Sequence, residues 1–276
     1  MKKVVFLLTT ALALTFANAQ TLTTPQPSPT QTIKQNFGVG FIELSYSRPA
    51  KKDRKVMGDL VPFGKVWRTG ANAATTLTFS EDVTIGGTAV KAGKYGLLSI
   101  PDAGKWVIII SKDATVNQPS NYKMENDVVR VEANVGTLPF SVENFTIDFA
   151  DITGSSCNVQ LIWENTYVQF AVTTGTDAKV MSQIDNLMNK DNKPYFSAAS
   201  YYYDNGKDLT QAATWVNKAL ETNKEAFWIY LLKARILKKT GDKAGSKVAA
   251  TMCKDLATKA KNDDYVKMAT ELLAGL

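Results

Sequence analysis

The side chains best suited to bind a ligand lie in one irregular stretch of the chain, between Tyr46 and Thr76. Three arginines in it, Arg48, Arg54 and Arg68, carry fixed positive charges on planar forks of N–H donors, which suit carboxylate, phosphate or sulfate groups. The remaining candidate ligand-binding residues of the stretch are aromatic or polar: Tyr46, Trp67, Asn72 and Thr75. Together these residue types predict a pocket for a small polar or anionic ligand.

The same stretch also allows a structural interpretation, which the sequence favours. The arginines can bond to loop carbonyls or nearby carboxylates, and the basic run at 51–55 can be a solvated face. Trp67 can plug the open end of a β-sandwich, and Asn72 can cap a turn. The two interpretations differ in geometry, because a ligand site needs a cleft lined by Arg68, whereas a structural tie buries that arginine against carbonyl groups.

Histidine is absent from the chain, and this limits the chemistry of any active site. Ser-His-Asp and Cys-His catalysis are excluded, and so are metal sites built on imidazole. An enzyme would have to use carboxylates, Lys, Tyr, Ser, Arg or a metal held by oxygens, and Asp53 or Asp82 could act as acid or base beside the arginines. Residues 125–127 lack the twelve-residue pattern of a calcium loop. We therefore predict no metal or cofactor and favour a function that is not enzymatic.

The N-terminus has the features of a cleavable signal peptide over residues 1–19. Lys2 and Lys3 precede an apolar segment, Val4–Phe16, that is too short to span a bilayer, and residues 17–19 form an A-x-A cleavage site. Cleavage after Ala19 predicts a periplasmic or secreted protein. No later apolar stretch is long enough to predict a membrane span. The formal net charge of +6 is spread along the chain, so a nucleic-acid partner is not expected.

Period-two patterns then predict a β domain at residues 33–174, after a flexible, proline-containing lead-in at 20–32. Alternating strands separated by turn residues favour an antiparallel β-sandwich or a jelly-roll-like fold. The segment Trp106–Ile110 is apolar throughout, so we expect it to be covered on both faces. Glu164-Asn165-Thr166 is interpreted as a short connector between two strands.

At residues 174–176 the hydrophobic period changes from two to that of a helix, which predicts a helical domain at 175–276 and an α+β protein overall. Asn205-Gly206 and Thr240-Gly241 are turn pairs inside helical hairpins whose spacing is similar to degenerate tetratricopeptide repeats. We expect a protein partner to bind through these helices. An aromatic cluster on the second helix is interpreted as core between the two domains; its members are Tyr195, Phe196, Tyr201, Tyr202 and Tyr203.

The motifs of the arginine-containing stretch resemble a bacterial family, domain of unknown function 2911, over roughly residues 31–174. The elements that carry the resemblance are Tyr46-Ser47-Arg48-Pro49, Gly58–Gly64, Val66-Trp67-Arg68, Gly70-Ala71-Asn72, Ala92–Leu97, Ile100-Pro101 and Trp106–Ile109. The chain has Lys52-Asp53-Arg54 where the family usually has Lys-Gly-Arg. The resemblance implies a β-sandwich and supplies no activity.

The sequence thus supports two functional hypotheses. The leading one is an exported protein whose β domain binds a small ligand or serves as a scaffold, while its helices bind a protein partner. The alternative is a histidine-independent enzyme that acts on an envelope carbohydrate or another small polar molecule. Cys157 and Cys253 fall in different predicted domains, so we expect both thiols to be unpaired.

Overall fold

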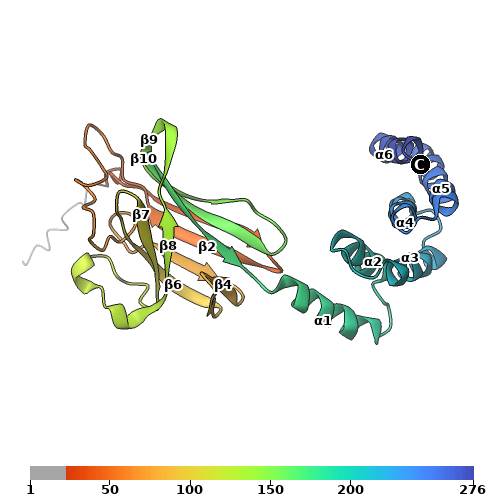
Figure 1. Cartoon of the computed structure of the whole chain (residues 1–276), viewed down its shortest axis with the longest axis horizontal. Helices are drawn as coiled ribbons and strands as arrows, with labels where there is room; N and C mark the ends of the chain where they lie inside the picture. The colour runs from red at the N-terminus through yellow and green to blue at the C-terminus, as the bar shows by residue number, and fades with distance from the viewer. Residues whose placement is uncertain (1–22) are drawn as a thin grey trace, which may run out of the picture. The chain divides into compact units, whose positions relative to one another are not determined.

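The computed structural model describes residues 23–276, so the predicted signal peptide lies outside the described part of the chain. The chain divides into two compact units, one ending at Thr174 and the other comprising Gly175–Leu276 (Figure 1). Each unit is described by itself. Within residues 23–276, no helix combines the length and the hydropathy needed to cross a lipid bilayer.

The first unit consists of two antiparallel sheets. The larger sheet has the order β1-β2-β3-β6-β7-β8 and the smaller one β5-β4-β10-β9. The strands are β1 (Thr30–Phe37), β2 (Gly40–Ser47), β3 (Thr76–Phe79), β4 (Val83–Ile85), β5 (Thr88–Val90), β6 (Gly93–Ile100), β7 (Lys105–Ser111), β8 (Asp127–Asn134), β9 (Gly136–Ala150) and β10 (Ser156–Thr173). Neighbouring strands of the larger sheet are also consecutive in the chain, except that β4 and β5 of the smaller sheet lie between β3 and β6 in the sequence. This order favours a plain sandwich over a jelly roll.

Alternation of apolar and polar residues places one face of each sheet in a shared core. Leu44 on β2, Ile108 on β7, and Phe145 and Leu161 on β9 and β10 are all buried in that single cluster. β7 is covered on both faces, as predicted, because Ile109 on its opposite face packs in a second cluster with Leu98 and Val116. The prediction of an antiparallel β-sandwich is confirmed.

Two boundaries differ from the sequence-based expectation. β1 begins at Thr30, inside the expected flexible lead-in, because residues 30–32 pair with residues 45–47 of β2. The expected connector at 164–166 is not a turn, since β10 runs through it with two register shifts against β9. Glu164 adopts a left-handed backbone conformation there (φ 52°), which marks a β-bulge, and the buried positions of β10 change from odd-numbered before it to even-numbered after it.

The second unit is helical throughout. It comprises α1 (Thr176–Met188), α2 (Tyr195–Asp204), α3 (Leu209–Thr222), α4 (Phe227–Lys239), α5 (Lys243–Lys259) and α6 (Asp263–Ala274). The predicted turns separate α2 from α3 and α4 from α5. In each turn a glycine has positive φ, Gly206 at 64° and Gly241 at 89°, a conformation that glycine adopts at little cost. The α+β architecture with a helical C-terminal part is confirmed.

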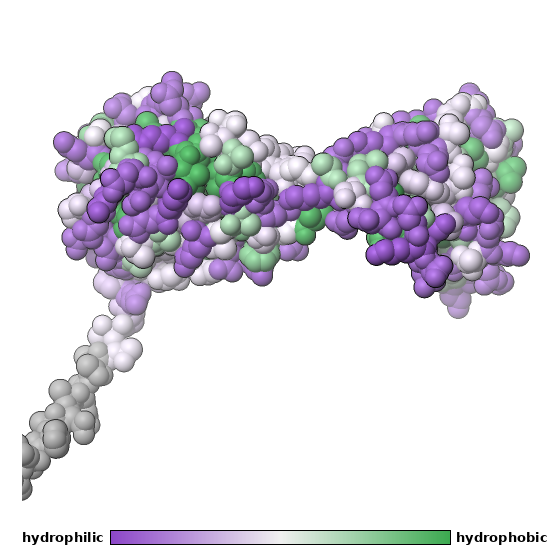
Figure 2. All heavy atoms as spheres, turned by 90° about the horizontal axis from the view of Figure 1, so that it is seen from below, coloured by the Kyte–Doolittle hydropathy of each residue, from purple (hydrophilic) through white to green (hydrophobic). Residues whose placement is uncertain are grey.

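Four of the five residues in the aromatic cluster of α2 belong to the helical unit's own core, and the fifth, Tyr201, donates its hydroxyl to Asp177 Oδ1 of the same unit at 2.9 Å. Tyr195, Phe196, Tyr202 and Tyr203 pack against a cluster that includes Val216 and Ile236 of α3 and α4. The expectation that this cluster forms core between the domains is therefore corrected, because its neighbours come from the same hairpins. Figure 2 shows that hydrophilic residues cover most of the visible face of the helical unit.

Candidate functional site

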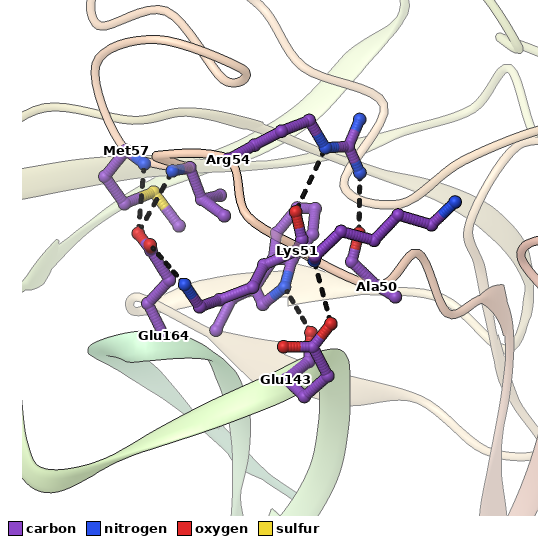
Figure 3. A network of polar contacts seen from close by, with 9 residues as sticks. Ala50, Lys51, Arg54, Met57, Glu143 and Glu164 are labelled. Carbon is purple, nitrogen blue, oxygen red and sulfur yellow. Dashed lines mark hydrogen bonds and ion pairs between the residues drawn. The ribbon is translucent and has the colours of Figure 1, made fainter.

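The irregular stretch between β2 and β3 folds over one end of the sandwich, where two glutamates of the smaller sheet hold it (Figure 3). Glu164 at the β10 bulge accepts hydrogen bonds through Oε2 from the backbone N–H groups of Val56 (3.2 Å) and Met57 (3.5 Å). Its Oε1 lies 3.7 Å from Lys51 Nζ. Glu143 on β9 accepts from the N–H of Lys52 through Oε1 at 2.8 Å. These bonds fix the loop that carries the candidate residues.

Two of the three arginines also hold the loop in place, Arg48 by bonds to the smaller sheet and Arg54 by bonds within the loop. Arg48, the residue after β2, donates from Nε to the carbonyl of Phe145 (3.2 Å) and from Nη2 to Thr146 Oγ1 (2.9 Å), which joins the start of the loop to β9. Arg54 donates from Nε to the carbonyl of Lys51 (3.0 Å) and from Nη2 to that of Ala50 (2.6 Å). The turn at this point is made by Lys52 with φ 54°, one residue before the position at which the family usually has glycine.

Tyr46 and Thr75 are buried, with 1% of each residue exposed. The hydroxyl of Tyr46 donates to Gln31 Oε1 (3.0 Å) and accepts from the N–H of Ile147 (2.9 Å). Burial raises the pKa of Tyr46 above its usual value, so the phenol stays neutral. Thr75 donates to the carbonyl of Thr69 at 2.6 Å. Neither side chain lines a cleft, and we leave both out of the proposed site.

Trp67 closes the end of the sandwich core. Its ring lies 4.9 Å from that of Phe145, 6.0 Å from Trp163 and 6.1 Å from Trp106, between ring centroids. The indole N–H donates to the carbonyl of Gly70 at 3.1 Å. Gly70 has φ 152°, and a Cβ there would lie 2.9 Å from Thr75 Oγ1, so the loop itself requires glycine at this position.

A pocket of about 360 Å³ opens beside this plug. This volume lies within the range of small-molecule sites. Three cationic side chains line the pocket, Arg54, Lys65 and Arg68, and no aspartate or glutamate does. The rest of the lining is mostly apolar and includes Leu60, Pro62, Val66, Trp67, Pro119 and Trp163. The pocket therefore combines positive charge with an apolar wall, which suits a ligand that has an acidic group on an apolar or ring-shaped body.

Arg68 is the side chain of the pocket with the most unused donors. Its Nη1 donates to the carbonyl of Asn117 at 3.2 Å. Its Nε is shielded from solvent and has no hydrogen-bond partner in the described part of the chain. A guanidinium offers five N–H donors, so one bond to a neutral carbonyl leaves most of its capacity for an anion. Arg68 thus differs from Arg48, which is held by two bonds to β9.

Asn72 lies at the edge of the site without lining the pocket. It has φ 56°, in the left-handed region that asparagine tolerates, and donates from Nδ2 to the carbonyl of Ser28 at 3.1 Å. Ser28 itself lines the pocket, so Asn72 positions the N-terminal segment beside it. Of the seven candidates, the structure places Arg54, Trp67 and Arg68 in one pocket and uses the other four as ties around it.

Sequence reasoning missed two important residues of the pocket, Lys65 and Trp163. Lys65 lies two positions before Trp67 in the same irregular stretch, so a complete count of the cations in that stretch would have found it. Trp163 lies on β10, nearly a hundred residues further along the chain, and its alternation marked it only as a core residue. The pairing of a β10 residue with the loop depends on tertiary structure.

The carboxylates that an enzyme would need do not line this pocket. Asp53 is exposed on the loop, and Asp82 pairs with Lys91 at 2.8 Å and accepts from the N–H of Ala92. Among residues 23–276, no group of three or more acidic or cysteine side chains is arranged to hold a metal ion. The arrangement is suited to binding an anion, and it offers no acid–base pair at the pocket.

The chain belongs to the DUF2911 family, described as proteins of unknown function. The family model matches residues 28–172, which covers nearly the whole sandwich and all of the arginine-containing loop. No curated protein matches the chain, and no solved structure matches it. Membership in the DUF2911 family thus agrees with the motif resemblance and assigns no activity, so function has to be argued from the pocket.

Proposed function

We propose that the sandwich of this DUF2911 protein binds a small anionic ligand in the pocket beside Trp67. The observation that carries the proposal is the lining of that pocket, in which three cations face no carboxylate. A site without an internal counter-charge attracts anions and rejects cations. We place the acidic group of the ligand at Arg68, with Arg54 and Lys65 adding positive charge, and its apolar body against Leu60 and Trp67.

A signal peptide at 1–19 would deliver the protein to the periplasm or the medium, so we infer an envelope component or nutrient as the source of the ligand. The charge and the aromatic wall together suit a sugar acid or an aromatic acid. The alternative of an enzyme acting on a carbohydrate is not favoured by the pocket, because the candidate acids Asp53 and Asp82 lie outside its lining. A binding experiment has to distinguish this ligand-binding role from that of a scaffold that binds no ligand.

The proposal is tested by melting temperatures measured with matched pairs of anionic and neutral compounds: glucuronate and glucose, benzoate and benzyl alcohol, phenyl phosphate and phenol. We expect at least one anion to raise the melting temperature while its neutral partner does not, because only the folded state binds it. The Arg68→Gln variant should lose this increase. If no anion raises the melting temperature, or if Arg68→Gln responds like the wild type, the pocket is not an anion site.

A further inference from the structure

The helical unit has a cationic groove of its own, which shares no residue with the pocket of the sandwich. It has a volume of about 560 Å³ and lies between α2, α4 and α6. Three cations of α4 line it, Arg235, Lys238 and Lys239, and all three are exposed. Residues three and four apart lie on one face of a helix, so the three charges form a single row along α4.

The charges of this row are not neutralised inside the protein. Among the described residues, none of the three cations forms an ion pair. Arg235 donates from Nη2 to the thioether of Met268 at 3.6 Å, and a thioether is a weak acceptor. The ammonium of Lys239 lies 5.2 Å from the ring centroid of Tyr203. These contacts orient the two side chains and leave their charges available to a partner.

The balance of charge along the chain supports the same conclusion. Residues 175–276 carry sixteen basic and twelve acidic side chains, whereas residues 33–174 carry fourteen of each. The excess positive charge of the predicted mature chain therefore belongs to the helical unit. A positive unit with an unpaired cationic groove attracts negatively charged partners and accelerates their association.

The floor of the groove distinguishes between classes of anionic partner. Tyr203, Met268 and Leu272 supply an apolar lining between the charges, and Glu271 adds one negative charge at the margin. A polymer with dense negative charge has no apolar groups to pack against this floor. A protein segment that mixes acidic and apolar side chains satisfies both parts of the groove.

We propose that the groove between α2, α4 and α6 binds an acidic, partly apolar segment of a partner protein. Its carboxylates lie along Arg235 and Lys239, and its apolar side chains pack on Met268 and Leu272. The proposal does not depend on the anion pocket of the sandwich, because every residue that it uses belongs to α2, α4 or α6. It gives the helical unit an interaction surface and a partner of defined chemistry.

The test uses the full chain and fluorescence anisotropy with a labelled short peptide of alternating glutamate and leucine. Arg235→Gln together with Lys239→Gln should weaken binding by about tenfold, because two unpaired positive charges are removed from the contact. Lys238 is left unchanged, since a Cβ at Gly275 would lie 3.1 Å from its Nζ, which places this ammonium at the C-terminal end of α6. The matched control is Lys243→Gln with Lys247→Gln on α5, two exposed positions outside the groove, and it should leave binding unchanged.

A variant that is expected to bind the peptide more tightly distinguishes a specific effect from loss of folding, because a misfolded protein would bind more weakly. Glu271→Gln removes the one acidic side chain that lines the groove, so we expect tighter binding of the acidic peptide. The proposal is overturned if the α4 and α5 double variants weaken binding equally, or if Glu271→Gln does not tighten it. It is also overturned if heparin, a sulfated polymer without apolar groups, binds more tightly than the peptide and displaces it.

Discussion

Two arginines of the same loop have different roles, and their hydrogen bonds show why. Arg48 makes two bonds to β9, one of them to the backbone carbonyl of Phe145. Arg68 makes one bond, to the carbonyl of Asn117, and lines the cationic pocket. Loss of Arg48 would leave a buried acceptor without its charged donor, and this costs more free energy of unfolding than loss of the single hydrogen bond of Arg68 at the pocket wall. The first arginine is structural, and the second is available for binding.

This difference predicts losses of stability of different size for two alanine substitutions. Arg48→Ala should lower the free energy of unfolding by about 2 kcal/mol, because two charge-assisted hydrogen bonds between the sheets are lost. Arg68→Ala should lower it by less than about 1 kcal/mol. Urea denaturation of both variants measures the two values. Equal destabilisation, or a larger effect at Arg68, would show that Arg68 is a structural tie after all.

At the scale of elements, the site is made when the β10 bulge meets the loop after β2. Periodicity in the sequence predicted the antiparallel sandwich, the helical C-terminal part and the loop that contains the site. It did not predict the bulge, because Glu164-Asn165-Thr166 has the composition of a turn, and only pairing with β9 shows that the strand continues. It also missed the contribution of Trp163 to the pocket. Residues brought together by tertiary pairing leave no local pattern.

The bulge gives a prediction of its own. Glu164→Gln removes the negative charge that holds the N–H groups of Val56 and Met57 and attracts Lys51. We expect a loss of about 1–2 kcal/mol in the free energy of unfolding. Amide hydrogen exchange at residues 56 and 57 should become faster. The control is Glu132→Gln, which breaks an exposed pair with Lys105 and should cost less than about 1 kcal/mol. Unchanged exchange at both amides would rule out this role for the bulge.

At the scale of the whole molecule, the protein contains two units that each bury one free cysteine. Cys157 lies in the sandwich core and Cys253 in the helical core, and both are unpaired. Burial raises the pKa of each thiol from 9.0 to about 11. Both thiols are therefore neutral and unreactive near neutral pH.

These raised pKa values predict loss of stability in alkali. The two buried thiols stabilise the folded state while they are protonated. This contribution is fully present below pH 9.0, the ordinary thiol pKa, and is lost as the pH rises through about 11. The free energy of unfolding, measured by urea denaturation in a reducing buffer, should therefore fall between these values. Cys157→Ala with Cys253→Ala should fall less steeply over the same range. An equal slope for both proteins would contradict this assignment.

The most direct test of the anion pocket is the nuclear magnetic resonance signal of the Arg68 Nε–H group during titration with phenyl phosphate, followed together with the indole N–H of Trp67. The Arg68 Nε–H has no partner within residues 23–276, so its signal responds to an anion that binds the other N–H groups of the same guanidinium. We predict that both signals shift and saturate, while phenol leaves the Arg68 signal unchanged. A phosphate-dependent shift at other arginines with no change at Arg68 would contradict the account.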